Sequence, residues 1–327
     1  MIGKGDDGEH VSDLQELLNR TELNPRLELD GDFGTRTEEA VTGYQASRGL
    51  TPDGICGEHT WGALYEGKGP LPPPPHALSS RDIAEICKVA LESDISNYKW
   101  KDRGFAPDGY TQGMALAFAQ TYRKLMQGHP AAIEMAKART NSDKDALEVY
   151  FIQFSNLGMS NEAPGKNTLR HLYALMLGHG MRESSGRHCE GRDLSASNTS
   201  SDTAEAGLFQ TSYNAHGASE PEFGQLTGEY SNPAYMATCY LTSFDDGVTC
   251  TNDEWACFGS GEGYAFQKLC KKCPAYAVET CALTLRNLCN HYGPIVRHET
   301  ELRPEADEMF KQVQNYIDSH YGDEAVA

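Results

Sequence analysis

Residues 30–37, DGDFGTRT, and residues 53–60, DGICGEHT, share the pattern D-G-x-x-G-x-x-T at a spacing of 23 residues. An Asp-Gly pair favours a turn, and the second glycine of each copy permits another sharp bend. The threonine that closes each copy, Thr37 or Thr60, lies near the expected start of a helix, where its hydroxyl can cap free backbone amides. Each copy therefore predicts a turn followed by a helix.

The sequence around this repeat has helical periodicity. Val11, Leu14 and Leu18 share one helical face, and Val41 and Tyr44 share another. These faces predict a small unit with a core of its own.

Several spaced motifs agree in order over residues 3–66. After a first helix come D-G-x-F-G, T-x-x-A-V-x-x-Y-Q, G-L-x-x-D-G-I-x-G and T-W-x-x-L. In this order they resemble the peptidoglycan-binding module of bacterial and phage wall enzymes. The resemblance implies a three-helix fold that targets an enzyme to the cell wall, with Asp30, Asp53 and Trp61 serving the fold rather than the wall contact. A spacer domain without a ligand is the alternative.

A proline-rich stretch follows this unit. Residues 67–71, GKGPL, and the four prolines of residues 72–75 cannot join a regular ladder, so they predict a stiff, extended spacer. We therefore expect a wall-binding domain over residues 1–67, a linker over 68–79 and a catalytic domain over 80–327.

The remaining sequence is predicted to be mostly helical. Ser79-x-x-Asp82 is the pattern of a capping box. Apolar stripes at helical spacing mark three further helices: Met114, Phe118, Tyr122 and Leu125; Leu169, Leu172, Tyr173 and Met176; and Met309, Val313, Tyr316 and Ile317. Because no β-α alternation appears, the fold class is mainly α, with at most a small sheet.

Charge and hydropathy restrict the partners. A formal net charge of −19 argues against nucleic acid, because phosphate binding relies on clustered Lys and Arg. No run approaches the roughly 18 apolar residues of a membrane span. The first residues, MIGKGDD, lack the pattern of a signal peptide, so we expect no encoded export route. We expect a monomer without a cofactor.

The candidate catalytic group is Glu183, which ends the third predicted helix within residues 178–186, GHGMRESSG. The carbonyls at a helix C-terminus repel a carboxylate, and apolar neighbours such as Met181 desolvate it. Both effects raise the pKa of Glu183, as a general acid requires. An exposed carboxylate paired with Arg182 or Arg187 is the alternative.

Two further motifs follow Glu183 in a recognisable order. They are residues 206–212, AGLFQTS, and residues 290–294, NHYGP. Over residues 165–295 this order resembles the lysozyme-like superfamily, closest to goose-type lysozymes and soluble lytic transglycosylases. The resemblance implies that Glu183 protonates the glycosidic oxygen, that Ser184 and Gln210 shape the sugar site, and that Tyr292 contacts the acid. The sequence departs from the family in reading Asn-His-Tyr-Gly where Tyr-Asn-Ala-Gly is usual, and in its cysteine-rich stretch.

Glycosidases commonly use a second carboxylate as nucleophile or base. The candidates between Glu183 and the 207–210 turn are Glu190, Asp193, Asp202 and Glu205. We favour Asp193 and Asp202, because the small, polar residues from 193 to 201 are suited to one wall of a cleft. If neither faces Glu183, the alternative is a transglycosylase, in which one Glu serves as acid and then base.

Eight of the ten cysteines fall between Cys189 and Cys289, which favours disulfides. The pair Cys270-x-x-Cys273 also allows zinc, although a strong zinc pattern has two such pairs. His188 beside Cys189 leaves open a cysteine amidase or peptidase. We interpret Cys56 and Cys87 as isolated buried thiols.

Together these features predict a muramidase that cleaves the β-1,4 bond between N-acetylmuramic acid and N-acetylglucosamine in peptidoglycan glycan strands. Such an enzyme acts at the bacterial cell wall, in the periplasm or outside the cell, as a phage endolysin does. A lytic transglycosylase, a chitinase or chitosanase, and a non-catalytic wall-binding protein are the alternatives.

Overall fold

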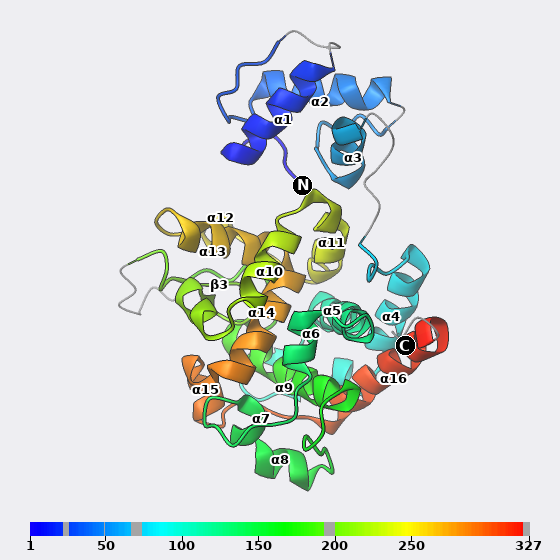
Figure 1. The fold of residues 1–327 in the computed structure, drawn as a ribbon, viewed down its shortest axis with the longest axis vertical. Helices are drawn as coiled ribbons and strands as arrows, with labels where there is room; N and C mark the ends of the chain where they lie inside the picture. The colour runs from blue at the N-terminus through cyan, green and yellow to red at the C-terminus, as the bar shows by residue number, and fades with distance from the viewer. Residues whose placement is uncertain (22–25, 49, 67–73, 193–199, 323–327) are drawn as a thin grey trace. The chain divides into compact units, whose positions relative to one another are not determined.

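The computed structural model describes residues 1–21, 26–48, 50–66, 74–192 and 200–322. The chain divides into two compact units, Met1–Pro75 with Asn232–Ala237, and His76–Ser231 with Thr238–Ala327. Both units are built from helices (Figure 1), and the strands among the described residues form two sheets of two strands each. The predicted fold class, mainly α with at most a small sheet, is confirmed. Residues 67–73 of the expected linker lie outside the described residues.

The smaller unit packs three helices around one core. They are α1 (Glu9–Arg20), α2 (Thr35–Ser47) and α3 (Glu58–Glu66). The predicted apolar faces are correct, because the core includes Val11, Leu14, Leu18, Val41 and Tyr44. Burial of such faces is the main source of stability for helices this short.

A buried glutamine ties each copy of the repeat to the helix before it. Gln15 of α1 donates from Nε2 to Oδ1 of Asp30 at 2.8 Å. Gln45 of α2 donates in the same way to Oδ1 of Asp53 at 2.8 Å. We call Gln15 with residues 30–37, and Gln45 with residues 53–60, the glutamine clamps. They explain why the aspartates recur.

The glycine and threonine of each copy complete its clamp. The amides of Gly31 and Gly54 donate to the two glutamine Oε1 atoms, at φ values of 70° and 72° that favour glycine. The predicted capping role of the threonines is wrong. Thr37 and Thr60 are the third residues of their helices, and their hydroxyls accept hydrogen bonds from the clamp glutamines. The N-cap of α2 is Gly34, which has no side chain to offer.

The larger unit contains the other elements, apart from the residues of η3 up to Ala237. Its helices are α4 (Ser80–Glu92), α5 (Asp108–Met126), α6 (Pro130–Met135), α7 (Ala146–Val149), α8 (Phe151–Asn156), α9 (Lys166–Ser184), α10 (Glu222–Tyr230), α11 (Leu241–Phe244), α12 (Asn252–Trp255), α13 (Glu262–Lys272), α14 (Pro274–Asn287), α15 (Gly293–Val296) and α16 (Pro304–Tyr321). Short 3-10 helices are η1 (Asp94–Asn97), η2 (Tyr213–Ala218), η3 (Pro233–Cys239) and η4 (Cys289–His291). The strands are β1 (Lys99–Trp100), β2 (Gly104–Phe105), β3 (Glu205–Ala206) and β4 (Thr211–Ser212). None of the described helices is both long and apolar enough to cross a membrane.

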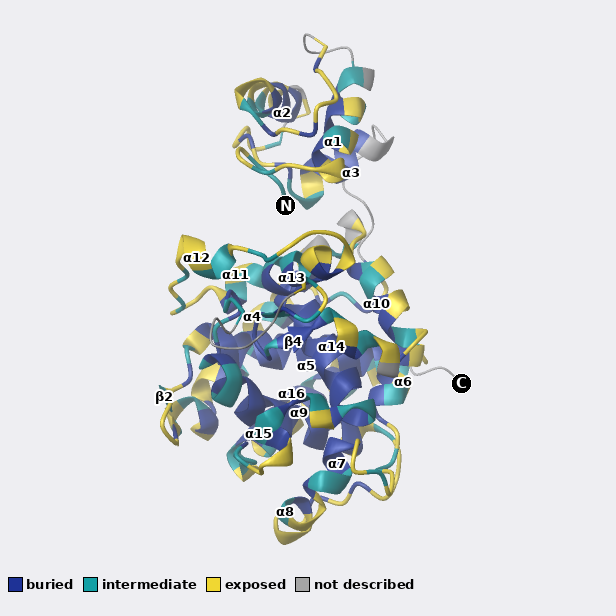
Figure 2. Cartoon of the chain, turned by 90° about the vertical axis from the view of Figure 1, so that its left-hand side faces the viewer, coloured by how far each residue is buried: buried dark blue, intermediate teal, exposed yellow. Residues whose placement is uncertain are grey.

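The core of the larger unit lies around α5 and α9, which pack against each other and against α16 and α14 (Figure 2). The predicted capping box at the start of α4 is present, with Ser79 and Asp82 bonded reciprocally. Its Asp82 also accepts a hydrogen bond from Tyr316 of α16 at 2.8 Å, so this helix start is fastened to the last helix. The same part of α16 contacts the first turns of α9, where Lys166 pairs with Asp318 and Arg170 bonds to Gln314.

Candidate active site at the end of α9

Helix α9 is enclosed by protein over most of its length. All of its residues from Thr168 to Met181 are buried. The helix stops because Ser185 and Gly186 have φ values of 57° and 77°, in the left-handed region that ends helices. This exit leaves Glu183 in the last turn, at the boundary between the core and the surface.

Glu183 is held in a setting that favours its protonated form. Its side chain is 17% exposed. Burial, and next the negative charge of Glu205, raise the pKa of Glu183 to about 7, against the opposing charges of Arg103, Arg297 and Arg182. A carboxyl with this pKa can donate a proton near neutral pH. The raised pKa of Glu183 agrees with the sequence-based expectation, whereas the effect of the Glu205 charge was not part of that expectation.

Ser184 joins the end of α9 to the Gly-Leu-Phe-Gln turn. Its Oγ donates to the carbonyl of Leu208 at 2.8 Å and accepts from the amide of Arg187 at 3.1 Å. The turn connects β3 to β4, and Gln210 closes it by donating from Nε2 to the carbonyl of Gly207 at 3.1 Å. The first two predicted motifs therefore lie together in the structure.

Tyr292 packs against the same region from the buried side. It is buried, and its hydroxyl pairs with Oγ1 of Thr211 of β4 at 2.7 Å. Its ring meets the ring of His179 edge-on, with centroids 4.6 Å apart. The resemblance implied a direct contact with the acid, whereas the hydrogen bonds given for this hydroxyl are to Thr211, Cys281 and Thr284.

His179 is the neighbour of Glu183 that the sequence analysis missed. It lies one turn earlier on α9, is fully buried between Phe209 and Tyr292, and has Nε2 3.9 Å from Oε1 of Glu183. Burial and the nearby His291 lower its pKa to about 3, so the imidazole is neutral near pH 7. The signal was present, because residues four apart share a helix face.

Of the two favoured second carboxylates, the structure describes only Asp202. Asp193 lies outside the described residues. Asp202 is exposed, and its side chain meets the hydroxyl of Ser201 at 3.4 Å. Glu205, which was considered but not favoured, is the described carboxylate whose charge acts on Glu183.

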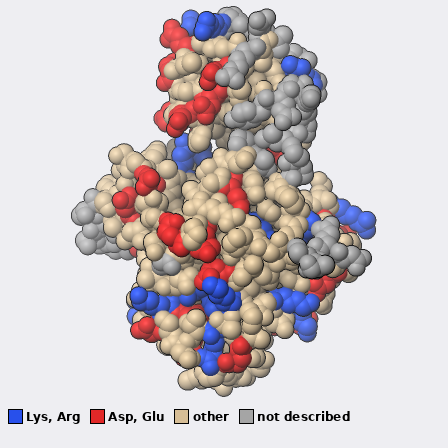
Figure 3. Space-filling view, viewed as in Figure 1, with Lys and Arg blue, Asp and Glu red and all other residues tan. Residues whose placement is uncertain are grey.

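A cavity of about 360 Å³ opens beside the end of α9. It lies between the tip of the β1–β2 hairpin, the last two turns of α9 and residues 298–301, and Arg182 is among its lining residues. Acidic and basic side chains are interspersed on the face of the larger unit shown in Figure 3.

The cysteines pair only in part as expected. Disulfides join Cys189 to Cys250 and Cys239 to Cys273. The remaining cysteines are free thiols: Cys56, Cys87, Cys257, Cys270, Cys281 and Cys289. Of the two predicted buried thiols, Cys56 is buried and Cys87 is only half-buried.

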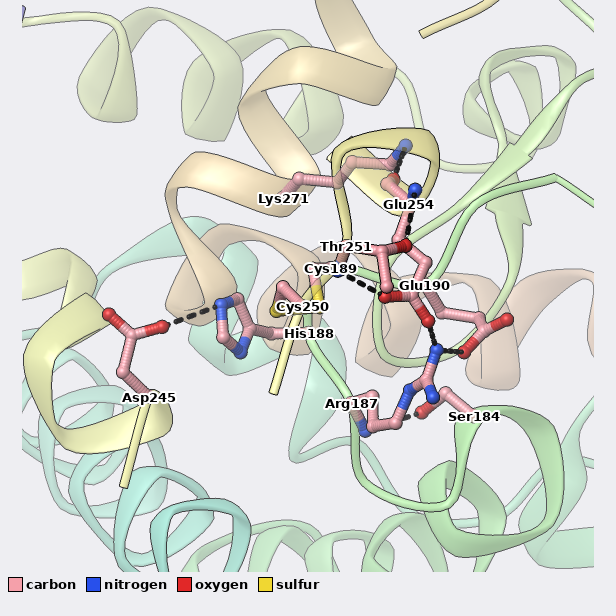
Figure 4. The surroundings of a disulfide bond; sticks show 10 residues. All are labelled: Ser184, Arg187, His188, Cys189, Glu190, Asp245, Cys250, Thr251, Glu254 and Lys271. Carbon is pink, nitrogen blue, oxygen red and sulfur yellow. Dashed lines mark hydrogen bonds and ion pairs between the residues drawn. A yellow bond between two sulfur atoms is a disulfide. The ribbon is translucent and has the colours of Figure 1, made fainter. Parts of the chain in front are cut away.

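These pairings overturn two alternatives, and Figure 4 shows the pair Cys189–Cys250. The Cys270-x-x-Cys273 pair cannot hold zinc as a pair of thiolates, because Cys273 is in a disulfide. Cys189 cannot be the nucleophile of an amidase, because its sulfur is bonded to Cys250. Its neighbour His188 instead points to Asp245, with Nε2 3.1 Å from Oδ1.

Residues 7–64 match the family of putative peptidoglycan-binding domains. The expectation of a peptidoglycan-binding domain in this part of the chain is thereby confirmed. The lysozyme-like character of the larger unit stays a prediction.

Three curated proteins share short stretches with this chain. Identity is 42% over 64 residues with an uncharacterized protein of Kitasatospora aureofaciens, 35% over 66 residues with a zinc D-Ala-D-Ala carboxypeptidase of Streptomyces albus G, and 41% over 58 residues with an N-acetylmuramoyl-L-alanine amidase of Mycobacterium tuberculosis. These stretches cover 20%, 20% and 18% of this chain, and 54%, 26% and 14% of the respective relatives. The chain thus spans about half or less of the length of each.

Among solved structures, the crystal structure of a Burkholderia AP3 phage endolysin matches with 14% identity, over 96% of this chain and 98% of that chain. Its TM-score of 0.20 is too low to indicate a common arrangement.

Proposed function

We propose that this protein is a peptidoglycan-degrading glycosidase that cleaves the β-1,4 bond between N-acetylmuramic acid and N-acetylglucosamine, with Glu183 as the general acid. The observation that carries the proposal is the buried helix-end carboxyl of Glu183, with a pKa of about 7. Protonation of the leaving oxygen is the step for which glycosidases use a carboxyl of raised pKa.

The peptidoglycan-binding domain supports the choice of polymer. The relatives named above include a carboxypeptidase and an amidase, and the matched stretch is 26% or less of those two proteins. A stretch of similar sequence therefore occurs in two proteins with different named activities. In this chain it would bring the larger unit to its substrate there.

The other site residues hold the acid and the sugar in place. Ser184 fixes the turn that carries Gln210, and Gln210 borders the position of the sugar. Tyr292 and His179 support Glu183 from the core. For hydrolysis, Glu205 is the described candidate for the base that activates water, and Asp193 and Asp202 remain candidates by their place in the sequence.

A lytic transglycosylase on the same bond is the second candidate. It is favoured by the exposure of Asp202, because a transglycosylase needs no second carboxylate opposite the acid. The sugar's own 6-hydroxyl would then close an anhydro ring after Glu183 has given up its proton.

Mass spectrometry of fragments released from purified sacculi tests the proposal. Reducing muramic ends indicate hydrolysis, and anhydro-muramyl ends indicate transglycosylation. Freed peptides without glycan cleavage would refute the glycosidase. Glu183→Gln should abolish release, whereas Glu308→Gln, at an exposed position on α16, should leave it unchanged.

A further inference from the structure

Three side chains that can bind a metal lie together beyond the end of α9 (Figure 4). His188 and Cys189 follow the exit of this helix, and Cys250 lies shortly before α12. One nitrogen of His188 and the two sulfurs lie within 4.8 Å of one another. The bond lengths of a tetrahedral zinc site place its ligand atoms roughly 3.5 Å apart. Small movements therefore bring all three onto one ion once the sulfurs are no longer bonded to each other.

The imidazole of His188 is buried without a full set of hydrogen bonds. The residue is 0% exposed, and its ring packs edge-on against Trp255, with centroids 5.6 Å apart. Nε2 faces Oδ1 of Asp245 at 3.1 Å, whereas Nδ1 has no hydrogen-bond partner among the described residues. A buried polar atom without a partner calls for an explanation, and imidazole is the commonest metal ligand in proteins.

Two thiolates and an imidazole are the donor set that zinc prefers in structural sites, where it takes four ligands. Asp245 is available as the fourth, because its carboxylate already faces His188 and its side chain, 51% exposed, can turn to an ion. Cys250 is only half-buried, so the ion has a way in from the surface. The other disulfide, Cys239–Cys273, has no comparable third ligand in the part of the chain that the structure describes.

Contacts other than the disulfide hold the two segments of the site in place. The carbonyl of Glu190, next to Cys189, accepts a hydrogen bond from the amide of Gly207 at 2.9 Å. The buried Lys271 donates from Nζ to the carbonyl of Glu254 of α12 at 2.6 Å. Arg187 of the first segment forms an ion pair with the same Glu254 (Figure 4). The ligands therefore stay close together when the disulfide is open.

We propose that His188, Cys189, Cys250 and Asp245 bind a zinc ion when the disulfide between the two cysteines is reduced. A dithiol supplies the two electrons and two protons that open the S–S bond, and is itself oxidised to a disulfide. Zn²⁺ then replaces the two thiol protons, which go to solvent. The ion holds the exit of α9 to the segment before α12, as the disulfide does in the oxidised chain. This inference does not depend on the proposed function.

The test uses the full-length chain, reduced with dithiothreitol and freed from it under nitrogen, with Co²⁺ as the spectroscopic probe. The reduced wild type should bind one Co²⁺ with thiolate-to-metal absorption bands that Zn²⁺ removes, and the oxidised protein should show none. His188→Gln and Cys250→Ser should each weaken binding at least about 100-fold, and Asp245→Asn about tenfold. The matched control, Cys239→Ser with Cys273→Ser, should bind as the wild type does.

The control is fair because the reduced chain has neither disulfide to lose. Circular dichroism checks the fold of each variant, and Asp245→Asn, at a half-exposed side chain, decides the matter if His188→Gln does not fold. Zn²⁺ should also raise the urea midpoint of the reduced wild type and leave that of the oxidised protein unchanged. Binding that survives His188→Gln, binding lost in the control, or a reduced wild type without thiolate bands would each overturn the inference.

Discussion

Replacing Glu183 with glutamine should increase the stability of the protein at neutral and alkaline pH while removing its activity. Folding raises the pKa of Glu183 from 4.5 to about 7. The folded state therefore holds the proton more tightly than the unfolded chain. Below pH 4.5 the carboxyl is protonated in both states and costs nothing. As the pH rises to about 7, the unfolded chain releases the proton first, so the wild type loses stability across this window.

The size of the effect follows from the shift. One pKa unit corresponds to about 1.4 kcal/mol, so the shift predicts a loss of roughly 3 kcal/mol once the carboxyl is fully ionised. Glutamine has nearly the same shape and no charge to desolvate. The free energy of unfolding of Glu183→Gln should therefore match that of the wild type near pH 4 and exceed it by up to about 3 kcal/mol near pH 9.

Urea unfolding of both full-length proteins at several pH values measures this difference. Glu308→Gln, at an exposed position, serves as the matched control and should change stability by no more than about 0.5 kcal/mol. Release of sugar fragments should fall by about 100-fold or more in Glu183→Gln, as expected when a general acid is lost. In the wild type, kcat/KM should decline as the pH rises through about 7. A constant stability difference between pH 4 and pH 9, or a variant as active as the wild type, would refute the reasoning.

Three other substitutions test the surrounding structure. Ser184→Ala removes the hydrogen bond to the Leu208 carbonyl and should lower stability by about 1–3 kcal/mol and activity with it; unchanged values in both assays would contradict the role of this contact. Replacing Cys239 and Cys273 together by serine opens a loop with a sequence separation of 34 residues and should cost about 4 kcal/mol, measured by urea unfolding under oxidising conditions; after reduction, which also opens Cys189–Cys250, wild type and variant should unfold alike. Gln45→Leu breaks one glutamine clamp and should weaken sedimentation with sacculi while leaving cleavage of soluble glycan intact, so equal losses in both would contradict the separation of roles.

Local patterns in the sequence predicted much of the fold. The turn after each Asp-Gly pair and the capping box at Ser79 were predictable because the interacting groups lie within a few residues of each other. The roles of Thr37 and Thr60 were not predictable, because their hydroxyls accept hydrogen bonds from Gln15 and Gln45, which lie 22 and 15 residues away. The local sequence suggested that these threonines cap their helices, but tertiary contacts with the glutamines determine what their hydroxyls bind.

The sequence predicted some of the contacts of the candidate site and missed others. Helical spacing and the Gly-rich exit single out Glu183, and Ser184 meets the 207–210 turn as the order of motifs suggested. The choice between Asp202 and Glu205 depended on the directions of side chains around a two-stranded hairpin. The cavity was beyond prediction, because Trp100 and Thr300 lie on segments that only the complete fold brings together.

The glutamine clamps have a consequence for how this module can vary. Each clamp fastens a helix to the turn that comes after it and is satisfied within its own half of the module. Insertions between a clamp helix and its turn lengthen a loop whose ends are already fixed, and the entropic penalty of such lengthening grows only with the logarithm of loop length. A module built in this way can lengthen the loop from each clamp helix to its turn while the hydrogen bonds of both clamps remain intact.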